Sequence, residues 1–470
     1  MQDGNIAGKR FFFVGVGGSG MMPLAMILAG RGASVAGSDR GLDQGRVPAK
    51  FADLEAKGVA LFPQDGSGVV SAEQIVVASA AVEATVADIV AAERLGCRRM
   101  SRAELNAALF NESRLPIGVA GTSGKSTVTG MIARILSDAG QDPTVMNGAV
   151  MKDFAAPDRP FASALVGAGA PYVSEVDESD GSIALYAPRI AVLNNVSLDH
   201  KSLEELNTLF GDFIGKAGTA IVNADNADAR ALAMQLPRER VTTFSLIGDA
   251  DLVAEDIVEA PFAARFSLRG TTVALQVPGR HNIGNALAAI GATLAAGVSF
   301  DVAVGAIGRF TGLKRRFDLV GEAGGVAVID DFGHNPDKIA ATLDTLHAFP
   351  GRLLILFQPH GFGPLKTMRR ELVESFVERL RPDDLLVLPD PVYQGGTVTR
   401  DVTSADIVRD IEIAGHTARH IPDRAAAAAH LVASARPGDR IVVMGARDDT
   451  LPLLAADMVA QLGGAAGAKC

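Results

Sequence analysis

The stretch GVAGTSGKST, residues 118–127, combines an apolar run with a glycine turn and opens onto the amphipathic run Val128 to Leu136. Backbone N–H groups in such a turn point at one spot, and the start of a following helix adds partial positive charge there. The pattern therefore predicts a polyphosphate site, with Lys125 at the outer phosphates and the Ser126 hydroxyl on Mg²⁺. This arrangement indicates ATP. The structural alternative is a tight strand-to-helix turn with an exposed lysine.

The composition indicates a compact cytoplasmic protein. A length of 470 residues favours about three domains. The two cysteines, Cys97 and Cys470, lie far apart in the sequence and outline no disulfide framework, which favours a reducing cytoplasm. A formal charge of −10 argues against a general nucleic-acid binder. No segment approaches the ~18 apolar residues of a membrane span.

The first segment predicts a β-α-β unit with a nucleotide site. Residues 10–16 read as a buried strand, residues 21–30 as a helix, and residues 33–39 as a second strand. The glycine turn between the first strand and the helix could approach a diphosphate, and Asp39 could bind a ribose. Three interpretations of this turn stay open: it binds NAD, it binds another nucleotide, or its glycines only allow close packing. A further strand over 74–82 carries Ser79 at the same sheet edge, and a polar connection is expected over 106–115.

The central segment predicts a metal site beside the phosphates. Four carboxylates, at Glu175, Asp177, Glu178 and Asp180, follow a strand within six residues. Such oxygen ligands suit a metal ion that accompanies ATP, and the alternative is a solvated acidic turn. His200 lies beyond the strand 189–195, where functional groups gather in α/β sheets. Asn282, at the start of an alanine-rich helix, either caps that helix or contacts a base.

The last segment predicts a third βαβ domain with a parallel sheet. Strands are expected at 325–331, 352–357, 384–388 and 439–444, with helical stretches between them. Asn335 and Pro336 suit the cap and the first position of the helix that follows the first of these strands.

Seven motifs in this order, spread over nearly the whole chain, resemble those of the Mur ligase family. They are the first glycine-rich unit, GTSGKST at 121–127, EVDESD at 175–180, Asn195 with Asp199-His200, GRHNIGN at 279–285, RRFD at 315–318 and DDFGHNP at 330–336. The resemblance implies an α/β fold of three domains. These are a Rossmann-like UDP-sugar-binding domain at 1–115, a central P-loop ATPase domain with a mostly parallel sheet at 116–308, and a C-terminal Rossmann-like domain at 309–470.

The resemblance also implies roles for individual residues, with ATP and Mg²⁺ as cofactors. The implied catalytic residues are Lys125, His200, Arg316, His334 and His360. The implied ATP contacts are Gly121, Thr122, Ser123, Gly124, Lys125, Ser126, Thr127, Asn282, Asn285, Arg316 and Asp331. The implied UDP-sugar contacts are Gly15, Gly17, Gly18, Ser19, Gly20, Ser38, Asp39 and Ser79. The implied metal ligands are Ser126, Glu175 and His200.

The implied activity is ADP-forming peptide bond synthesis between the lactyl carboxylate of UDP-N-acetylmuramate and L-alanine, through an acyl phosphate, in peptidoglycan precursor synthesis. Several features differ from family members that add L-alanine. Among them, Gly361 follows His360 where those members carry an arginine, and the segment after His200 is shorter. Ligation of the recycled tripeptide L-Ala-γ-D-Glu-meso-diaminopimelate, or of another amine, therefore stays open.

Two other classes of function are weighed against the ligase. A nucleotide-binding regulator without catalysis would not need the retained Lys125, Glu175 and His200. An NAD-dependent oxidoreductase would leave the second phosphate loop unexplained. We expect a monomer or homodimer that binds neither nucleic acid nor membrane.

Overall fold

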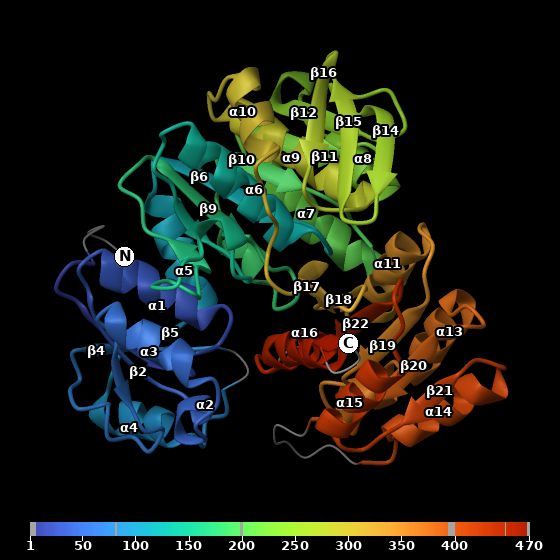
Figure 1. The fold of residues 1–470 in the computed structure, drawn as a ribbon. Helices are drawn as coiled ribbons and strands as arrows, with labels where there is room; N and C mark the ends of the chain where they lie inside the picture. Colours follow the sequence, from blue (N-terminus) through green and yellow to red (C-terminus); the bar gives the residue numbers. More distant parts are fainter. Residues whose placement is uncertain (1–5, 80–81, 198–200, 393–399, 447, 468–470) are drawn as a thin grey trace. The chain divides into compact units, whose positions relative to one another are not determined.

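The computed structural model describes residues 6–79, 82–197, 201–392, 400–446 and 448–467. The described residues form two compact units. Unit 1 draws on 1–259 and 263–313, and unit 2 draws on 260–262 and 314–470. Both units are α/β, and most of their strands pair in parallel (Figure 1). This confirms the predicted fold class, while the predicted boundaries at 115 and 308 stay predictions.

Unit 1 begins with a parallel five-stranded sheet in the order β3-β2-β1-β4-β5. Side chains alternate between its two faces, so Phe11 and Phe13 pack against α1 while Phe12 and Val14 pack against α4. The strands are β1 (Arg10–Val14), β2 (Ser34–Ser38), β3 (Ala60–Phe62), β4 (Gln74–Ala78) and β5 (Arg99–Ser101). The helices are α1 (Met21–Gly30), α2 (Arg40–Asp43), α3 (Pro48–Ala56), α4 (Ala87–Leu95) and α5 (Arg102–Glu112).

The prediction of a polar connection over 106–115 is wrong, because α5 runs through most of it. Ser101 and Glu104 form a capping box that starts this helix. Asn106 is buried, and its amide Nδ2 donates to Ser174 Oγ and to Tyr186 Oη, both at 2.9 Å. Tyr172 Oη in turn donates to Asn106 Oδ1 at 2.9 Å. The Asn106 side chain, which was expected to be solvated, therefore makes its hydrogen bonds with buried protein groups.

An eight-stranded sheet follows, in the order β13-β12-β11-β10-β6-β9-β7-β8. Among its described strands, β8 at the edge pairs antiparallel with β7, and the other neighbours pair in parallel. Helices α6 and α9 cover one face, and α5 and α7 the other. The strands are β6 (Leu115–Ala120), β7 (Thr144–Met146), β8 (Ala164–Leu165), β9 (Pro171–Glu175), β10 (Ile190–Leu193), β11 (Thr219–Asn223), β12 (Val241–Ser245) and β13 (Leu252–Val253). The helices are α6 (Lys125–Asp138), α7 (Leu203–Lys216), α8 (Ala227–Ala233), α9 (Arg280–Ala295) and α10 (Phe300–Ile307), with short 3₁₀ turns at Lys152–Phe154, Ser182–Leu185 and Arg238–Arg240.

A small three-stranded sheet, in the order β14-β15-β16, was not predicted. Its strands are β14 (Glu255–Ala260), β15 (Ala263–Leu268) and β16 (Thr271–Leu275), of which β15 and β16 pair antiparallel. Phe266 and Val273 of this sheet join the core that contains α9 and α10. The alternating burial along β15 fits a sheet with one covered face.

Unit 2 holds a six-stranded sheet in the order β17-β18-β22-β19-β20-β21. The parallel sheet is confirmed for β18, β22, β19, β20 and β21, but the prediction missed the antiparallel edge strand β17. Gly324 and Gly325, with φ of 59° and 74°, form the two-residue turn that joins β17 to β18. The strands are β17 (Asp318–Ala323), β18 (Val326–Asp331), β19 (Leu353–Phe357), β20 (Leu385–Leu388), β21 (Ala418–His420) and β22 (Arg440–Met444).

The helices of unit 2 cover both faces of its sheet. Ile329 and Ile355 face α11 and α13, while Val328 and Leu354 face α15 and α16. Asn335 caps α11 through a bond from Lys338 N, and Pro336 is its first residue, as predicted. The helices are α11 (Pro336–His347), α12 (Phe362–Thr367), α13 (Arg369–Arg379), α14 (Ser404–Ile413), α15 (Arg424–Ser434) and α16 (Leu451–Gly467).

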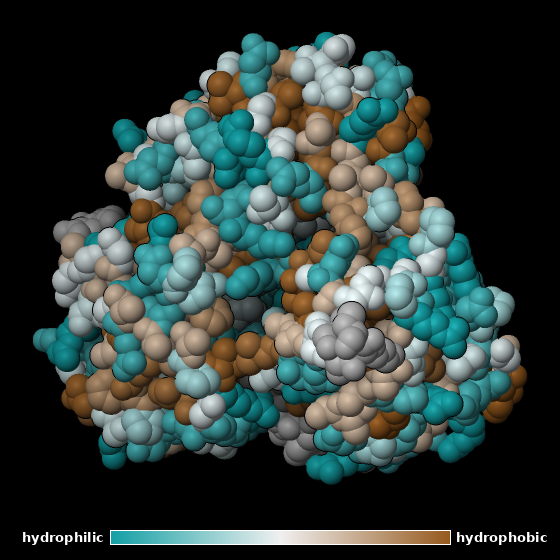
Figure 2. All heavy atoms as spheres, in the orientation of Figure 1, coloured by the Kyte–Doolittle hydropathy of each residue, from teal (hydrophilic) through white to brown (hydrophobic). Residues whose placement is uncertain are grey.

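The visible surface mixes hydrophilic and hydrophobic residues (Figure 2). Within the described ranges, no helix combines the length and the apolar character that crossing a membrane would require.

Candidate active site

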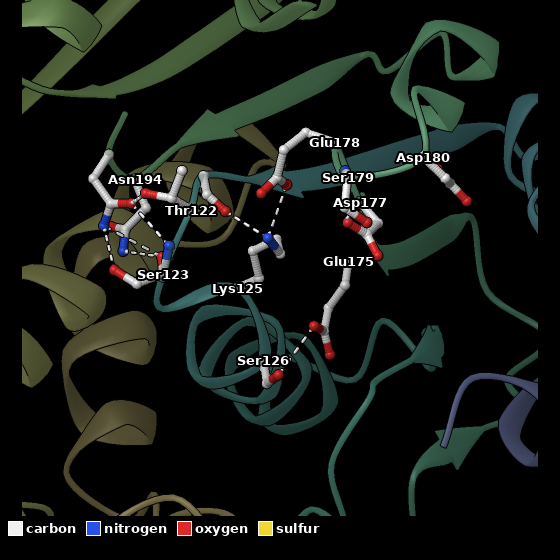
Figure 3. Close-up of polar contacts among 12 residues, drawn as sticks. Thr122, Ser123, Lys125, Ser126, Glu175, Asp177, Glu178, Ser179, Asp180 and Asn194 are labelled. Carbon is white, nitrogen blue, oxygen red and sulfur yellow. Dashed lines mark hydrogen bonds and ion pairs between the residues drawn. The ribbon is translucent and has the colours of Figure 1, made fainter. Parts of the chain in front are cut away.

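Three neighbouring parallel strands bring the predicted phosphate loop and the acidic segment together. β6 pairs with β9 on one side and with β10 on the other, with Val119 opposite Glu175 and Ala120 opposite Leu193. The carboxyl ends of these strands therefore meet at one edge of the sheet. The loop at 121–124, which leads into α6, leaves the sheet there, as do the acidic segment 175–180 and the pair Asn194-Asn195 (Figure 3). Open α/β sheets bind ligands at this edge.

The turn before α6 requires glycine at two positions. Gly121 and Gly124 have φ of +133° and +83°, a region that other L-residues rarely adopt. A Cβ on Gly124 would also lie 2.3 Å from Asn194 Nδ2 and 2.6 Å from Asn285 Oδ1. Gly124 has no side chain to cap α6, so the first N–H groups of this 14-residue helix are available to an anion.

Lys125 and Ser126 both contact carboxylates at this edge. Lys125 Nζ donates to Gly121 O at 2.7 Å and to Glu178 Oε2 at 2.9 Å. Ser126 Oγ donates to Glu175 Oε2 at 3.0 Å, and Gly148 N donates to Glu175 Oε1. Figure 3 shows Glu178 reaching Lys125 and Glu175 reaching Ser126. Because the hydroxyl proton of Ser126 is donated to the Glu175 carboxylate, the lone pairs of Ser126 Oγ can coordinate a cation.

The other two carboxylates of the acidic segment have different surroundings. Burial alone would raise the pKa of the Asp177 carboxyl, but a hydrogen bond from Ser179 N and the positive charges of Lys125 and Arg102 hold that pKa below its ordinary value. Asp180 is exposed and points away from Lys125 (Figure 3). Sequence analysis grouped all four acids, and only the structure identifies Glu178 as the partner of Lys125.

The two asparagines that follow β10 hold the phosphate loop in place. Asn195 Oδ1 accepts from Thr122 Oγ1 at 2.8 Å and from Ser123 N at 2.9 Å. Asn194 Nδ2 donates to Ser123 O at 3.1 Å and to Asn285 Oδ1 at 2.9 Å. The predicted metal ligand that follows in sequence, His200, lies outside the described residues.

Asn282 and Asn285 are buried at the start of α9. Asn282 Nδ2 donates to Pro278 O at 2.7 Å, and Asn285 Nδ2 donates to Asn282 Oδ1 at 3.1 Å. The residue that caps α9 is Gly279, so the interpretation of Asn282 as the cap is wrong. Asn285 lies beside the phosphate loop, where its Oδ1 accepts from Asn194 Nδ2. The contact of both amides with adenine stays a prediction.

The second glycine turn lies at the carboxyl end of β1, between β2 and β4. Gly15 has φ of +81°, and Gly18 and Ser19 are exposed. Asp39 accepts from Gly17 N at 2.9 Å and from Gly41 N at 2.7 Å, so each of its carboxylate oxygens accepts a hydrogen bond from a backbone N–H group. Ser38 is fully buried and donates to Asp88 Oδ2 at 2.6 Å. Ser79 follows β4 at the same edge, half-buried.

Asp88 is a buried carboxylate that sequence analysis did not single out. Burial raises its pKa, and the hydrogen bonds from Ser38 and from Gly66 N oppose that rise. Asp88 thereby ties the end of β2 to the loop that follows β3.

Unit 2 places Asp331, Arg316 and two histidines around the end of β18. Asp331 accepts from Phe317 N and Gly333 N at 2.9 Å and from Thr342 Oγ1 at 2.8 Å. The Arg316 guanidinium lies 4.4 Å from the centre of the Phe332 ring. The structure thus shows Asp331 organising the backbone around Arg316.

His334 and His360 are neighbours, with ring centres 5.3 Å apart in an edge-on arrangement. Burial, together with the positive charges of Lys338 and Arg316, lowers the pKa of His334 to about 3. His334 Nδ1 lies 2.9 Å from Phe332 O, and a carbonyl can only accept. His334 is therefore neutral at pH 7, with the proton on Nδ1 and a lone pair on Nε2.

A buried ion pair supports the same segment. Arg315 Nε lies 3.5 Å from Asp330 Oδ2. Within the described part of the chain, Arg315 Nε and both Asp330 carboxylate oxygens are buried without a hydrogen bond. Burial raises the pKa of Asp330 to about 7 although Arg315 opposes the rise.

Comparison with known proteins gives consistent matches along the chain. Three family models match: "Mur ligase family, catalytic domain" over 10–114, "Mur ligase middle domain" over 119–293 and "Mur ligase, glutamate ligase domain" over 315–447. A protein of Streptomyces coelicolor named UDP-N-acetylmuramate–L-alanine ligase is 36% identical, covering 94% of this chain and 95% of the relative. One of the same name from Desulfosudis oleivorans is 34% identical, covering 93% and 96%.

Two solved structures share the fold. A UDP-N-acetylmuramate–alanine ligase from Thermotoga maritima is 23% identical with a TM-score of 0.78, covering 97% of this chain and 99% of that chain. A murein peptide ligase from Psychrobacter arcticus is 24% identical with a TM-score of 0.69, with the same coverage.

The pair between Lys125 and Glu178 yields a stability prediction. Lys125→Ala leaves the buried Glu178 carboxylate without its cation, so we expect the free energy of unfolding to fall by about 1–3 kcal/mol. Adding Glu178→Gln in the same chain removes the uncompensated charge and should restore most of that loss. Urea denaturation of the wild type, both single variants and the double variant measures the coupling. Additive losses in this cycle would show that the two side chains do not interact.

Asp330 yields a pH prediction. Its pKa is raised from 3.8 to about 7 in the folded chain, so the unfolded chain releases this proton more readily. The stabilising contribution is fully present below pH 3.8 and is lost as the pH rises through about 7. Urea midpoints should therefore fall more steeply between pH 5 and pH 8 in the wild type than in Asp330→Asn. Asp337→Asn, at an exposed position, serves as the control and should keep the wild-type trend. Parallel trends in all three proteins would contradict the assignment.

Proposed function

This chain belongs to the Mur ligase family, and on that premise we propose that it joins L-alanine to the lactyl carboxylate of UDP-N-acetylmuramate while ATP is converted to ADP and inorganic phosphate. Two relatives with that printed activity, at 36% and 34% identity over nearly their whole lengths, support the choice of substrates. The observation that carries the use of ATP is the placement of Lys125 and Ser126 at the start of α6, each bonded to a carboxylate.

The proposed chemistry begins with activation of the acid, because a carboxylate is a poor acylating agent. The lactyl carboxylate oxygen attacks the γ-phosphorus of ATP, ADP leaves, and an acyl phosphate forms. The amine then attacks the acyl carbon, and inorganic phosphate leaves with the bonding electron pair. Both steps gather negative charge, so fixed cations and N–H dipoles supply much of the stabilisation.

Unit 1 supplies the proposed phosphate and metal contacts. The N–H groups at the start of α6 and the Lys125 ammonium bind the phosphates. Glu175 Oε2 and Ser126 Oγ lie 3.0 Å apart and offer oxygen ligands of the kind that Mg²⁺ prefers, so the residues fit the ion. The chemistry that bound Mg²⁺ supplies is neutralisation of phosphate charge. His200 is proposed as a ligand to a second Mg²⁺, and Asn282 and Asn285 as contacts to adenine.

Unit 2 supplies the remaining proposed contacts. We propose Arg316 for the γ-phosphate, Asp331 for the ATP ribose, and His334 and His360 for the amine. His334 keeps a lone pair on Nε2, so it can accept a hydrogen bond from the attacking amine. With a pKa of about 3, His334 orients that amine and does not take its proton at neutral pH.

The sugar-nucleotide site and the domain layout belong to the same proposal. The exposed backbone at Gly18 and Ser19, with Gly15, Gly17, Gly20, Ser38, Asp39 and Ser79 around it, is proposed to bind the UDP-sugar. We propose domains at 1–115, 116–308 and 309–470, a cytoplasmic location, and a monomer or homodimer.

Ligation of a tripeptide is the second candidate. Gly361 follows His360 and has φ of +146° at the start of α12, so no arginine side chain is present at that position to hold the carboxylate of a single amino acid. A murein peptide ligase also shares the fold.

The identity of the amine is tested by ADP release. Purified protein is mixed with ATP, Mg²⁺ and UDP-N-acetylmuramate, and each amine is added in turn: L-alanine, glycine, L-serine and the tripeptide. We expect ADP release with L-alanine to exceed that with the other amines, and Lys125→Ala to abolish it while calorimetry shows nearly unchanged affinity for the UDP-sugar. Release with the tripeptide alone would replace L-alanine as the substrate. If none of the amines leads to ADP release, the proposal that the protein is a ligase is contradicted.

A further inference from the structure

The turn that follows β19 carries His360 and then a residue without a side chain. Gly361 has φ of +146°, so a residue with a Cβ would be strained there. An amino acid carries a carboxylate beside its amine, and a carboxylate is bound most strongly by charged N–H donors. If His360 contacts the amine, a cation for the carboxylate must come from another position.

Three basic residues follow in α12 and α13, and each of them pairs with a carboxylate. The pairs are Lys366 with Asp401, Arg369 with Asp410 and Arg370 with Glu371, at N–O distances of 2.7, 2.7 and 3.1 Å. Because a neighbouring carboxylate balances each of these charges, the three residues are poor candidates for binding the carboxylate of a substrate.

Arg400 reaches the same turn from the segment that precedes α14. The central carbon of its guanidinium lies 5.4 Å from the centre of the Phe362 ring. Phe362 is the residue after Gly361, and Arg400 is exposed. A guanidinium has five N–H donors in one plane, so it can contact an aromatic ring with its face and a carboxylate with its edge.

The segment that carries Arg400 is fixed within unit 2. Val402 packs against the core that contains Phe357 of β19 and Leu365 of α12. Thr403 N and Oγ1 donate to Asp406 Oδ2 at 2.9 and 2.7 Å, and these bonds start α14. Because both flanks of the Phe362 contact are anchored, Arg400 loses less conformational freedom when it binds a ligand.

Lys338 of α11 is the other cation to consider beside the two histidines. Its positive charge contributes to the lowered pKa of His334. An ammonium is a point charge, whereas a guanidinium matches both oxygens of a planar carboxylate. The geometry of the ligand therefore favours Arg400 over Lys338.

We propose that Arg400 binds the carboxylate of the amino acid that this chain ligates, through two parallel N–H···O bonds, while His334 and His360 orient the amine. The inference rests on the proposed function, since it takes an amino acid as the attacking amine. It makes Arg400 a specificity-determining residue, because an amine without the carboxylate loses this ion pair.

The test compares L-alanine with L-alaninamide, in which a neutral amide replaces the carboxylate. ADP release by the full chain is measured at saturating ATP, Mg²⁺ and UDP-N-acetylmuramate. Arg400→Gln should raise the KM for L-alanine about 10- to 100-fold and change the KM for L-alaninamide little. Arg400→Lys keeps the charge without the fork and should lose part of the preference for L-alanine. Arg370→Gln, at an exposed position paired with Glu371, is the matched control and should keep the wild-type preference.

The outcomes of this experiment are distinguishable. An equal rise in KM for both amines in Arg400→Gln would indicate a structural role and overturn the inference. An unchanged KM for L-alanine in Arg400→Gln overturns it as well, and a rise found only in Lys338→Gln would assign the carboxylate to α11. If the wild type releases no ADP with L-alanine, it is the proposed substrate that fails, and this inference fails with it.

Discussion

The parallel register between β6 and its two neighbours is the constraint on which the candidate site depends. With Val119 opposite Glu175 and Ala120 opposite Leu193, three segments that are far apart in sequence must leave the sheet at the same level. A shift of one residue in either pairing would turn the alternating side chains to the opposite face and separate Glu175 from Ser126. The buried side chains of β6, packed on α6 and α9 on one face and on α7 on the other, oppose such a shift.

Charge at this edge is balanced within unit 1. The start of α6 and Lys125 are positive, and Glu175 and Glu178 supply the compensating negative charge. Glu178 is 5% exposed, so an unpaired carboxylate there would be costly. A triphosphate that approaches Lys125 meets a cation already held in place, and the Asn194 and Asn195 amides fix the loop on which it sits. Little reorganisation is then needed at the moment of phosphoryl transfer.

Local patterns were sufficient where the chemistry is local. The glycines at 121 and 124, the helix over 21–30 and the cap at Asn335-Pro336 follow from backbone conformation and hydrogen-bond needs within a few residues. The same reasoning failed at Asn106, because the groups that satisfy its amide are 66 to 80 residues away in sequence. The capping box at Ser101 and Glu104 was a local signal that marks this helix.

The sequence also could not predict which of several similar side chains binds a given partner. Four acidic residues follow β9, and only tertiary structure separates Glu178, which binds Lys125, from Asp180, which is exposed. Asn282 looked like a helix cap because it stands near the start of α9, yet the glycine three residues earlier has that place. The edge strand β17 was missed because the turn that joins it to β18 consists of two glycines only, Gly324 and Gly325.

The central claim is that ATP is used to convert a carboxylate into an acyl phosphate that an amine captures. The most direct test labels the lactyl carboxylate of UDP-N-acetylmuramate with ¹⁸O and analyses the inorganic phosphate that is released. The account predicts that one labelled oxygen is transferred to phosphate in each turnover. Product formation with unlabelled phosphate would contradict it.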